Sequence, residues 1–429
     1  MKKQFRFKLI TLILLLLISN IAISQNYETS KSLNKSVIVP SDITVVVSNQ
    51  SGDLTFKSTD DSGINIKTDV KISGKSEEDV NQVLKAIEQF IFELDGNKLV
   101  IDTRFYKSMQ TVNNRRTITL LNGDKIKIKD FEISHEIHIP KNANLKLNNK
   151  YSDVFMESRG GEVSLVLYSS KLEGASFAKD VQIDSKYSKI HLLNFMQNAE
   201  LKLYDSDIKF TTCGDLNVQS RYSKIEAHKT DDVIIDSYDD KLYIDEINNL
   251  EFTAKYSDLV SKAELSDLNL DLYDSNIEIK SAIMGTFNGK YSNLKLGNVK
   301  EILIENSYDN DLYFRKTRKI SIEESKYCKY EIGEVGKFIL QGYDDSVTIS
   351  GLNKEFEGIA VNGKYCKLDV NAGNIPFQVN FKIKYPKIDI PESVKIIKQV
   401  EKNSDLELIG NESGGKILVE GHDMKVVIK

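Results

Sequence analysis

Tyrosines recur along most of this sequence, and each has a charged or small polar neighbour. From Tyr151 to Tyr365, successive tyrosines of this kind are mostly 16 to 19 residues apart. A tyrosine that follows lysine or arginine alternates with one that precedes aspartate or serine, as in the stretch from Lys186 to Phe210. Aromatic rings beside cations and carboxylates can bind a polymer by stacking, hydrogen bonding and charge. The same pattern can be purely structural, so the elements that position these residues must be identified first.

A frame of inward-facing residues explains the alternation. In one unit Ser185 points inward, the four residues 186–189 form an outward corner, and Ile190 points inward again. The last inward residue before each corner recurs every 17 or 18 residues between positions 149 and 342. Short runs of alternating apolar residues predict strands, and a repeat of this length predicts a solenoid. We therefore predict an all-β fold, a parallel β-helix with coils of about 17–18 residues.

If one unit is one coil, equivalent corner positions stack about 4.8 Å apart. The first corner position then alternates between Lys or Arg and Tyr, and the second alternates between Tyr and Asp or Ser. This arrangement would place each cation between aromatic rings and diagonal to a carboxylate, so that charge stacks without self-repulsion. The stripe is either a ladder that fixes register or a candidate binding surface. Its residues are Lys186, Tyr187, Tyr204, Asp205, Arg221, Tyr222, Tyr238, Asp239, Lys255, Tyr256, Tyr273, Asp274, Lys290, Tyr291, Tyr308 and Asp309.

Residues 1–24 have the features of a secretory signal. Four basic residues precede an apolar run that is short for a bilayer, and Ala22-Ile23-Ser24 offers small residues at a cleavage site. Cleavage would leave an exported chain without a transmembrane segment, in the periplasm or on the outer surface. It would change the net charge from −5 to −9, because four basic residues leave with the signal. Lysines and acids are interleaved, so nucleic acid is not an expected partner.

Residues 25–145 are predicted to cap the N-terminal end of the solenoid, because exposed strand edges favour aggregation. Alternating runs indicate strands there, and Ser76 precedes a helix predicted over about residues 77–94, with Asp79 at the capping-box position. Regular solenoid repeats are predicted over residues 146–370. Residues 371–429 are predicted to form irregular C-terminal coils and a cap.

Few residues suggest catalysis or metal binding. His135 and His138 are close in sequence, but on a strand they point to opposite faces, so a shared metal is not expected. No cofactor motif is present, and we expect no cofactor. The acid pairs Asp239-Asp240 and Asp344-Asp345 lie within the repeat frame. Parallel β-helices also house polysaccharide lyases and hydrolases, whose carboxylates cluster at one place, so this alternative stays open.

Cys213, Cys328 and Cys366 are predicted to be free thiols. Cys328 and Cys366 each occupy a "KYCK" corner, and the corner at Tyr343-Asp344 lies between them. One unit per coil would place their Cα atoms two coils apart, about 9.6 Å, which exceeds the ~7 Å limit for a disulfide. A coil made of two units would instead make them stacked neighbours.

The stretch "FEISHEIHIPKNANLKLNNKYSDVFMESRGGEVSLVLYSSKLEG" resembles the putative adhesin family of Bacteroidetes, as does "VSNQSGDLTF" near the start. It combines an alternating strand, a Pro-Lys-Asn-Ala turn and serially stacked strands. The resemblance covers most of the chain after the signal and implies an exported, right-handed β-helix. It leads to the hypothesis of a non-enzymatic, adhesin-like protein whose partner is a cell-surface polysaccharide or an envelope protein. The alternatives are a structural or sensory envelope protein without a ligand and, less favoured, a β-helix lyase or hydrolase.

Overall fold

The structure is a computed structural model that describes residues 26–429 except 114, 175 and 412. The predicted secretory signal lies outside these residues. The described chain is nearly all strand, with a single helix near its N-terminal end. It divides into two compact units, one ending at Glu157 and the other running from Ser158 to Lys429. No helix among the described residues is both long enough and apolar enough to cross a membrane.

The first unit pairs its strands in two series. One series runs β1–β4–β10–β3–β12, with antiparallel pairs followed by parallel ones, and the other runs β11–β2–β6–β5. A small antiparallel sheet, β7–β8–β9, completes the unit. The elements are β1 (Tyr27–Ile38), β2 (Thr44–Asn49), β3 (Asp53–Thr59), β4 (Gly63–Gly74), α2 (Glu77–Glu88), β5 (Ile91–Asp95), β6 (Lys98–Asp102), β7 (Tyr106–Val112), β8 (Arg115–Leu120), β9 (Lys125–Ile128), β10 (Asp130–Pro140), β11 (Asn144–Lys150) and β12 (Val154–Met156).

Helix α2 begins as predicted but is shorter than predicted. The Oγ of Ser76 accepts a hydrogen bond from the backbone N–H of Asp79 (3.2 Å), which confirms the N-cap. The helix buries one apolar face against β1, β4 and β9. It ends at Glu88, whereas the prediction extended it to about Leu94. The reason is that the apolar residues of the predicted last turn belong to β5, which pairs with β6 in an antiparallel hairpin. Gly96, at the tip of this hairpin, has a left-handed φ of 57°.

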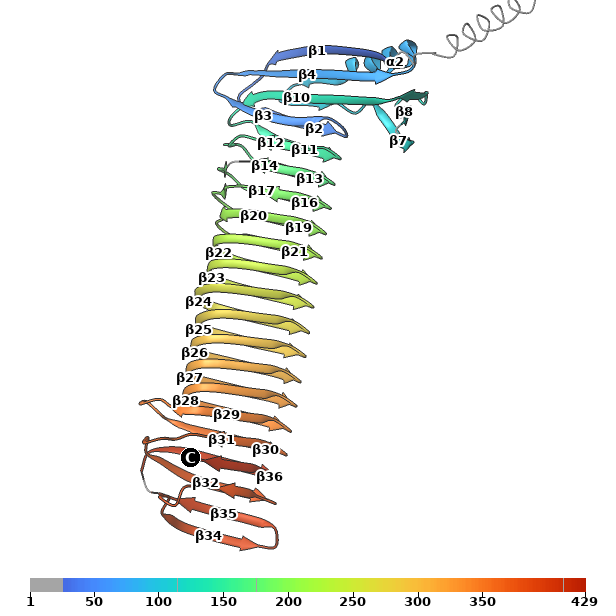
Figure 1. The fold of residues 1–429 in the computed structure, drawn as a ribbon. Coiled ribbons are helices and arrows are strands. Elements are labelled where there is room, and N and C mark those ends of the chain that lie inside the picture. The colour runs from blue at the N-terminus through green and yellow to red at the C-terminus, as the bar shows by residue number, and fades with distance from the viewer. Residues whose placement is uncertain (1–25, 114, 175, 412) are drawn as a thin grey trace, which may run out of the picture. The chain divides into compact units, whose positions relative to one another are not determined.

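The second unit is a β-solenoid, which confirms the predicted fold class. Register gives the coil length directly, because Val163 pairs with Val181 and Leu216 pairs with Val233, offsets of 18 and 17 residues. Short strands divide the first coils, each coil from β22 to β28 is a single long strand, and short strands return from β29 onward (Figure 1). The coil strands are β13 (Val163–Tyr168), β14 (Lys171–Gly174), β15 (Ser176–Phe177), β16 (Val181–Lys186), β17 (Lys189–His191), β18 (Asn194–Phe195), β19 (Ala199–Tyr204), β20 (Asp207–Thr212), β21 (Leu216–Arg221), β22 (Lys224–Tyr238), β23 (Lys241–Lys255), β24 (Asp258–Tyr273), β25 (Asn276–Lys290), β26 (Asn293–Tyr308), β27 (Asp311–Lys326), β28 (Lys329–Tyr343), β29 (Ser346–Leu352), β30 (Gly358–Lys364) and β31 (Lys367–Val370).

The C-terminal strands stack in an order that differs from their order in the chain. The last two strands lie between earlier ones: β36 pairs with both β30 and β32, and β37 pairs with both β31 and β33. Antiparallel pairs β32–β35 and β35–β34 then end the stack. These strands are β32 (Phe377–Lys384), β33 (Lys387–Asp389), β34 (Ile396–Lys402), β35 (Asp405–Gly410), β36 (Gly415–His422) and β37 (Lys425–Ile428).

Candidate functional site

The corners of the second unit are made by residues with a left-handed backbone at the second position. From Ser169 to Tyr365 their φ values lie between 47° and 63°. Few residues other than glycine adopt this region, and among those that do Asp and Asn are enriched, so the tyrosines there are unusual. Bonds between coils hold them. The N–H of Tyr187 donates to the carbonyl of Tyr204 (3.0 Å), and the N–H of Asp205 donates to the carbonyl of Arg221 (3.0 Å).

The third corner position points inward, so the predicted corner of four outward residues is wrong. Ser188 is 3% exposed. Its Oγ donates to the carbonyl of Lys186 (2.9 Å) and accepts the N–H of Ser170 from the neighbouring coil (3.2 Å). Because the left-handed residue reverses the alternation, the side chain after it turns into the core. Equivalent buried residues form what we call the inner ladder: Ser170, Ser188, Ser206, Ser223, Asp240, Ser257, Ser275, Ser292, Asn310, Cys328, Asp345 and Cys366.

Two members of the inner ladder are buried acids. The carboxylate of Asp345 accepts hydrogen bonds from the N–H of Cys328 (2.8 Å), the Oγ of Ser325 (2.9 Å) and the N–H of Tyr343 (3.1 Å). Burial outweighs these bonds and raises the pKa of Asp345 to about 6. Burial likewise raises the pKa of Asp240, which has equivalent partners. In each of the two acid pairs, Asp239-Asp240 and Asp344-Asp345, the second acid is therefore buried and accepts hydrogen bonds inside a corner.

The three cysteines are free, as predicted, and all three are buried. Lys329 pairs with Ser346, which pairs with Lys367, so the corner that contains Asp345 lies between Cys328 and Cys366. The two cysteines are therefore two coils apart, which confirms one unit per coil. Burial raises the pKa of Cys366 to about 11 and that of Cys213 to about 12, so these thiols stay protonated at neutral pH.

On the outside of the corners, the tyrosine rings form a continuous edge-to-face stack. From Tyr168 to Tyr365, successive ring centroids are 5.4–5.7 Å apart and successive ring planes meet at 76–84°. Rings at the first and second positions alternate along the stack, and it continues through His422 to Tyr385 in the cap. Tyr187 is 47% exposed and Tyr308 is 36% exposed, so ring surface is available along the whole row.

The predicted stacking of the first corner position is confirmed by strand register. Arg221 pairs with Tyr238, Tyr238 with Lys255, and Lys255 with Tyr273. The expected sandwich of cations between rings is not formed, because the rings contact one another. Among the described residues of these coils, the cation–π contact is made elsewhere, by Lys224 over Tyr243 at 5.4 Å.

The structure places the sixteen predicted residues along one row of corners, which we call the corner stripe. Its lysines, arginine and aspartates are exposed, and its tyrosines are exposed or half-buried. The pKa values of Tyr187, Tyr222, Tyr256 and Tyr291 are raised. The main cause is partial desolvation in the stack, and the neighbouring tyrosines and an aspartate raise them further. Their hydroxyls are therefore neutral hydrogen-bonding groups at physiological pH. Binding by the corner stripe stays a prediction.

A groove of about 520 Å³ lies beside the corner stripe. One wall consists of first-position residues from Lys186 to Lys255, including Tyr204 and Tyr238. The other wall lies two residues earlier in each coil: Asp184, Lys202, Gln219, Asp236 and Thr253. The groove thus combines aromatic rings with ammonium, amide, hydroxyl and carboxylate groups. Such a surface can hold an extended polar chain by stacking and hydrogen bonding.

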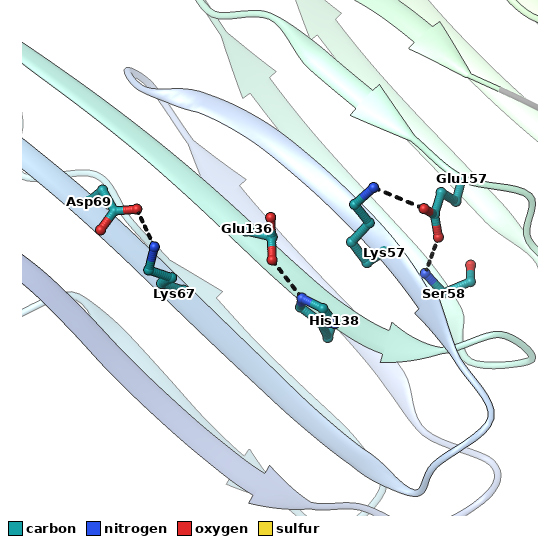
Figure 2. Close-up of polar contacts among 7 residues, drawn as sticks. All are labelled: Lys57, Ser58, Lys67, Asp69, Glu136, His138 and Glu157. Atoms are coloured by element: carbon teal, nitrogen blue, oxygen red, sulfur yellow. Dashed lines mark hydrogen bonds and ion pairs between the residues drawn. The ribbon is translucent and has the colours of Figure 1, made fainter.

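In the first unit, charged side chains form short-range pairs on the outward face of β4, β10 and β3 (Figure 2). The Nε2 of His138 lies 2.7 Å from Glu136, and the Nζ of Lys67 lies 2.7 Å from Asp69. Glu157 accepts hydrogen bonds from the N–H of Ser58 and the Nζ of Lys57, and these bonds lower its pKa. Lys57 and Lys67 each lie beside an opposite charge, so this face is a solvated ion-pair surface.

The two histidines of the HEIH motif lie on opposite faces, as predicted. His135 is 2% exposed, and its Nδ1 lies 2.9 Å from the Oγ1 of Thr68, whereas His138 is on the surface. Burial lowers the pKa of His135 to about 4, so this imidazole is neutral. Among the described residues, no cluster of three or more His, Cys, Asp or Glu side chains could hold a metal ion.

Comparison with protein-family models and with curated proteins finds no match. Among solved structures, the chain is similar to a putative cell adhesion protein from Clostridium sporogenes, with 10% identity, 93% of this chain and 99% of that chain covered, and a TM-score of 0.17. It is also similar to a putative adhesin from Parabacteroides merdae, with 9% identity, 70% and 96% coverage, and a TM-score of 0.22. At TM-scores this low, neither likeness carries an argument about this chain.

Proposed function

We propose that this protein is an exported, non-enzymatic, adhesin-like β-solenoid of the bacterial cell envelope that binds a surface polymer or an envelope protein along its corner stripe. The observation that carries the proposal is the unbroken stack of partly exposed tyrosines from Tyr168 to Tyr365. Aromatic groups repeated at the spacing of one coil suit a ligand that is itself long and repetitive. The proposed export rests on the secretory pattern of the N-terminal sequence.

The inner ladder supports a binding role for the corner stripe. If the protein had only a structural or sensory role, the tyrosine stack would serve to fix register. However, the inner ladder already joins each corner to the next by buried hydrogen bonds, such as that from the N–H of Asp240 to the Oγ of Ser257 (3.1 Å). The exposed rings outside the same corners are therefore not needed to fix the register of the coils. In addition, the second-position tyrosines have a left-handed backbone, which tyrosine seldom adopts.

The placement of the acid pairs supports a non-enzymatic role. A glycoside hydrolase needs two carboxyl groups that flank the same bond. Asp240 and Asp345 are each 2% exposed and point inward, whereas Asp239 and Asp344 are exposed on the corners. The members of each pair thus lie on opposite sides of the backbone and do not face one substrate together.

The test of the proposal is a glycan array combined with a pull-down from an envelope extract. The variant replaces Tyr204, Tyr222 and Tyr238 by asparagine, beside the groove of the corner stripe. The control is Ile234→Thr, since Ile234 is 50% exposed outside that groove. A ligand bound by the wild type and the control but lost by the triple variant supports the proposal. Equal binding by the triple variant, or no ligand in either assay, would contradict it, and a cytoplasmic protein in cell fractionation would contradict export.

A further inference from the structure

A second groove, of about 610 Å³, lies on the other side of the corners and contains no residue of the corner stripe. One wall is the fourth corner position, where Asp258, Asn276, Asn293 and Asp311 are neighbours in register. The other wall lies two residues later in each coil and runs from Tyr243 to Glu331, with Tyr313 one coil before its end. These side chains all point outward and are exposed. The groove therefore brings a row of carboxylates and amides beside a row that contains two tyrosines, Tyr243 and Tyr313.

The row of carboxylates and amides has more acceptors than donors, whichever way its amides are turned. The Nδ2 of Asn276 donates to Asp258 (2.8 Å), and the Nδ2 of Asn293 donates to the Oδ1 of Asn276 (2.7 Å). This direction leaves the Oδ1 of Asn293 beside the carboxylate of Asp311, so that two acceptors meet. Flipping an amide only moves the junction, because a carboxylate lies on each side of the two amides. Lys329, the next residue in register after Asp311, is paired with Glu331 (2.5 Å), so a donor from outside the protein, water or a ligand hydroxyl, can satisfy the junction.

An aromatic ring lies next to that junction. Tyr313 is two residues after Asp311 on β27, so both side chains project from the same side of the strand, about 6.6 Å apart along it. Tyr313 is 41% exposed, and Tyr243, at the far end of the same row, is 44% exposed. A ring beside hydrogen-bond acceptors can contact the apolar face of a sugar while the acceptors receive its hydroxyls. Four coils separate the two tyrosines, about 19 Å, which is room for several sugar units.

We propose that this groove is a binding site for a neutral polysaccharide strand that lies along the solenoid, with one sugar packed on Tyr313 and its hydroxyls donating to Asn293 and Asp311. The proposal deepens the proposed function, on which it rests, by naming a ligand class and a second face. The lining contains the acids Asp258, Glu278, Asp311 and Glu331 but only the lysines Lys295 and Lys329, and Lys329 is paired with Glu331 (2.5 Å). This charge balance disfavours a polyanion and leaves a ligand rich in hydroxyl donors.

The experiment is affinity electrophoresis of the full exported chain in gels that contain soluble starch, mannan or a β-glucan, with alginate as the anionic comparison. Asp311→Asn is the decisive variant, because its amide donates to Asn293 and removes the acceptor junction without a change in size. Asp207→Asn is the matched control: Asp207 occupies the same corner position outside the groove, between Lys189 and Lys224. Tyr313→Thr removes the ring. We expect Asp311→Asn and Tyr313→Thr each to weaken retardation in a neutral gel roughly tenfold, with Asp207→Asn unchanged.

Each other outcome has a definite meaning. Retardation that persists in Asp311→Asn, that occurs only with alginate, or that occurs in no neutral gel would overturn the inference. If the Tyr204/Tyr222/Tyr238 variant alone loses retardation, the corner stripe is the site, and the proposed function stands without the second groove. If Asp311→Asn alone loses it, the second groove is the polymer site and the corner stripe is not. A thermal shift with Ca²⁺ that Asp311→Asn abolishes, without retardation by a neutral gel, would replace the inference by a cation site.

Discussion

The two sides of each corner differ in what their contacts can do. On the inside, Ser257 is fully buried and its Oγ makes hydrogen bonds to Asp240, Ser237 and Lys255. On the outside, the adjacent Tyr256 is 45% exposed and makes edge-to-face ring contacts with Tyr238 and Tyr273. Buried hydrogen bonds are costly to leave unmade, whereas exposed contacts are individually weak.

This difference assigns separate roles to the two sides of the corner: the inner ladder specifies the coil, and the corner stripe is available for binding. The members of the inner ladder are all short side chains with a hydrogen-bonding atom, and the ladder joins successive corners in the core. The corner stripe presents rings and charges at a spacing set by the backbone behind it. We infer that substitutions on the inside reduce stability and that substitutions on the outside mainly change binding.

The largest effect is expected for Ser257→Ala. The substitution leaves the N–H of Asp240 without its buried acceptor and removes the donor to the carbonyl of Lys255, whereas Ser237 keeps its hydrogen bond to Asp240 (2.7 Å). We expect the free energy of unfolding, measured by denaturant titration, to fall by about 2–4 kcal/mol. Ser257→Cys is the matched control, because Cys328 and Cys366 occupy this position in other coils. A wild-type stability for Ser257→Ala would show that the inner ladder does not hold the corners.

The second prediction concerns the pH dependence of stability. The pKa of Asp345 is about 6 in the folded chain against 3.8 for an ordinary aspartate, so between these values the folded state binds a proton that the unfolded state has released. Stability from this group is therefore greatest below pH ~4 and falls as the pH rises towards 6, by up to about 3 kcal/mol. Asp345→Ser should remove this fall.

Thermal denaturation between pH 4 and pH 7 measures this effect as the difference between variant and wild type. Asp344→Asn is the control, since Asp344 is exposed at the second position of the same corner. We expect the wild type and Asp344→Asn to lose stability in parallel over this window relative to Asp345→Ser. Parallel curves for all three proteins would mean that Asp345 does not titrate in this window.

The third prediction tests the outside of the same corner. Tyr256→Asn removes the ring contacts to Tyr238 (5.4 Å) and Tyr273 (5.7 Å) but supplies a residue better suited to the left-handed backbone. These effects oppose each other, so the loss in unfolding free energy should be less than half of that for Ser257→Ala. A loss as large as that of Ser257→Ala would show that the tyrosine stack is a structural ladder, which would favour the role without a ligand.

The sequence predicts the coil and the first corner position because residue type and spacing coincide there. Arg221, Tyr238 and Lys255 recur in register and differ sharply from the alternating apolar residues around them. It does not reveal the inner ladder, because serine is usually a surface residue and simple alternation fails where Tyr256 is left-handed. One signal was available: from Ser170 to Cys366, each residue that replaces serine at this position, such as Asn310, is short and can accept a hydrogen bond.

Other features depend on contacts that no local pattern contains. From Tyr187 to Tyr327, the left-handed tyrosines are held by hydrogen bonds to the next coil, 16 or 17 residues away in sequence. The rings pair with one another instead of with lysine, because alternate tyrosines at the first and second positions fall within edge-to-face distance. The second groove likewise appears only when Asn293, Asp311 and Tyr313 are seen together, since each is unremarkable as a surface residue.

The smallest effect is expected for Lys255→Asp, on the outside of the corner behind which Ser257 lies. The substitution would place an acid beside Asp239, whose N–H donates to the carbonyl of residue 255, and near Asp274 on the other neighbouring coil. Exposed charge contacts are worth roughly 0.2–1 kcal/mol, and here attraction becomes repulsion on both sides. We expect a small fall in Tm that grows at low ionic strength, because salt screens exposed charges.

Lys255→Gln removes the cation without adding an acid, so the difference between the two variants isolates the repulsion. If both variants melt at the wild-type temperature in low salt, charge alternation along the corner stripe has no role in stability, and its lysines would be explained by binding alone.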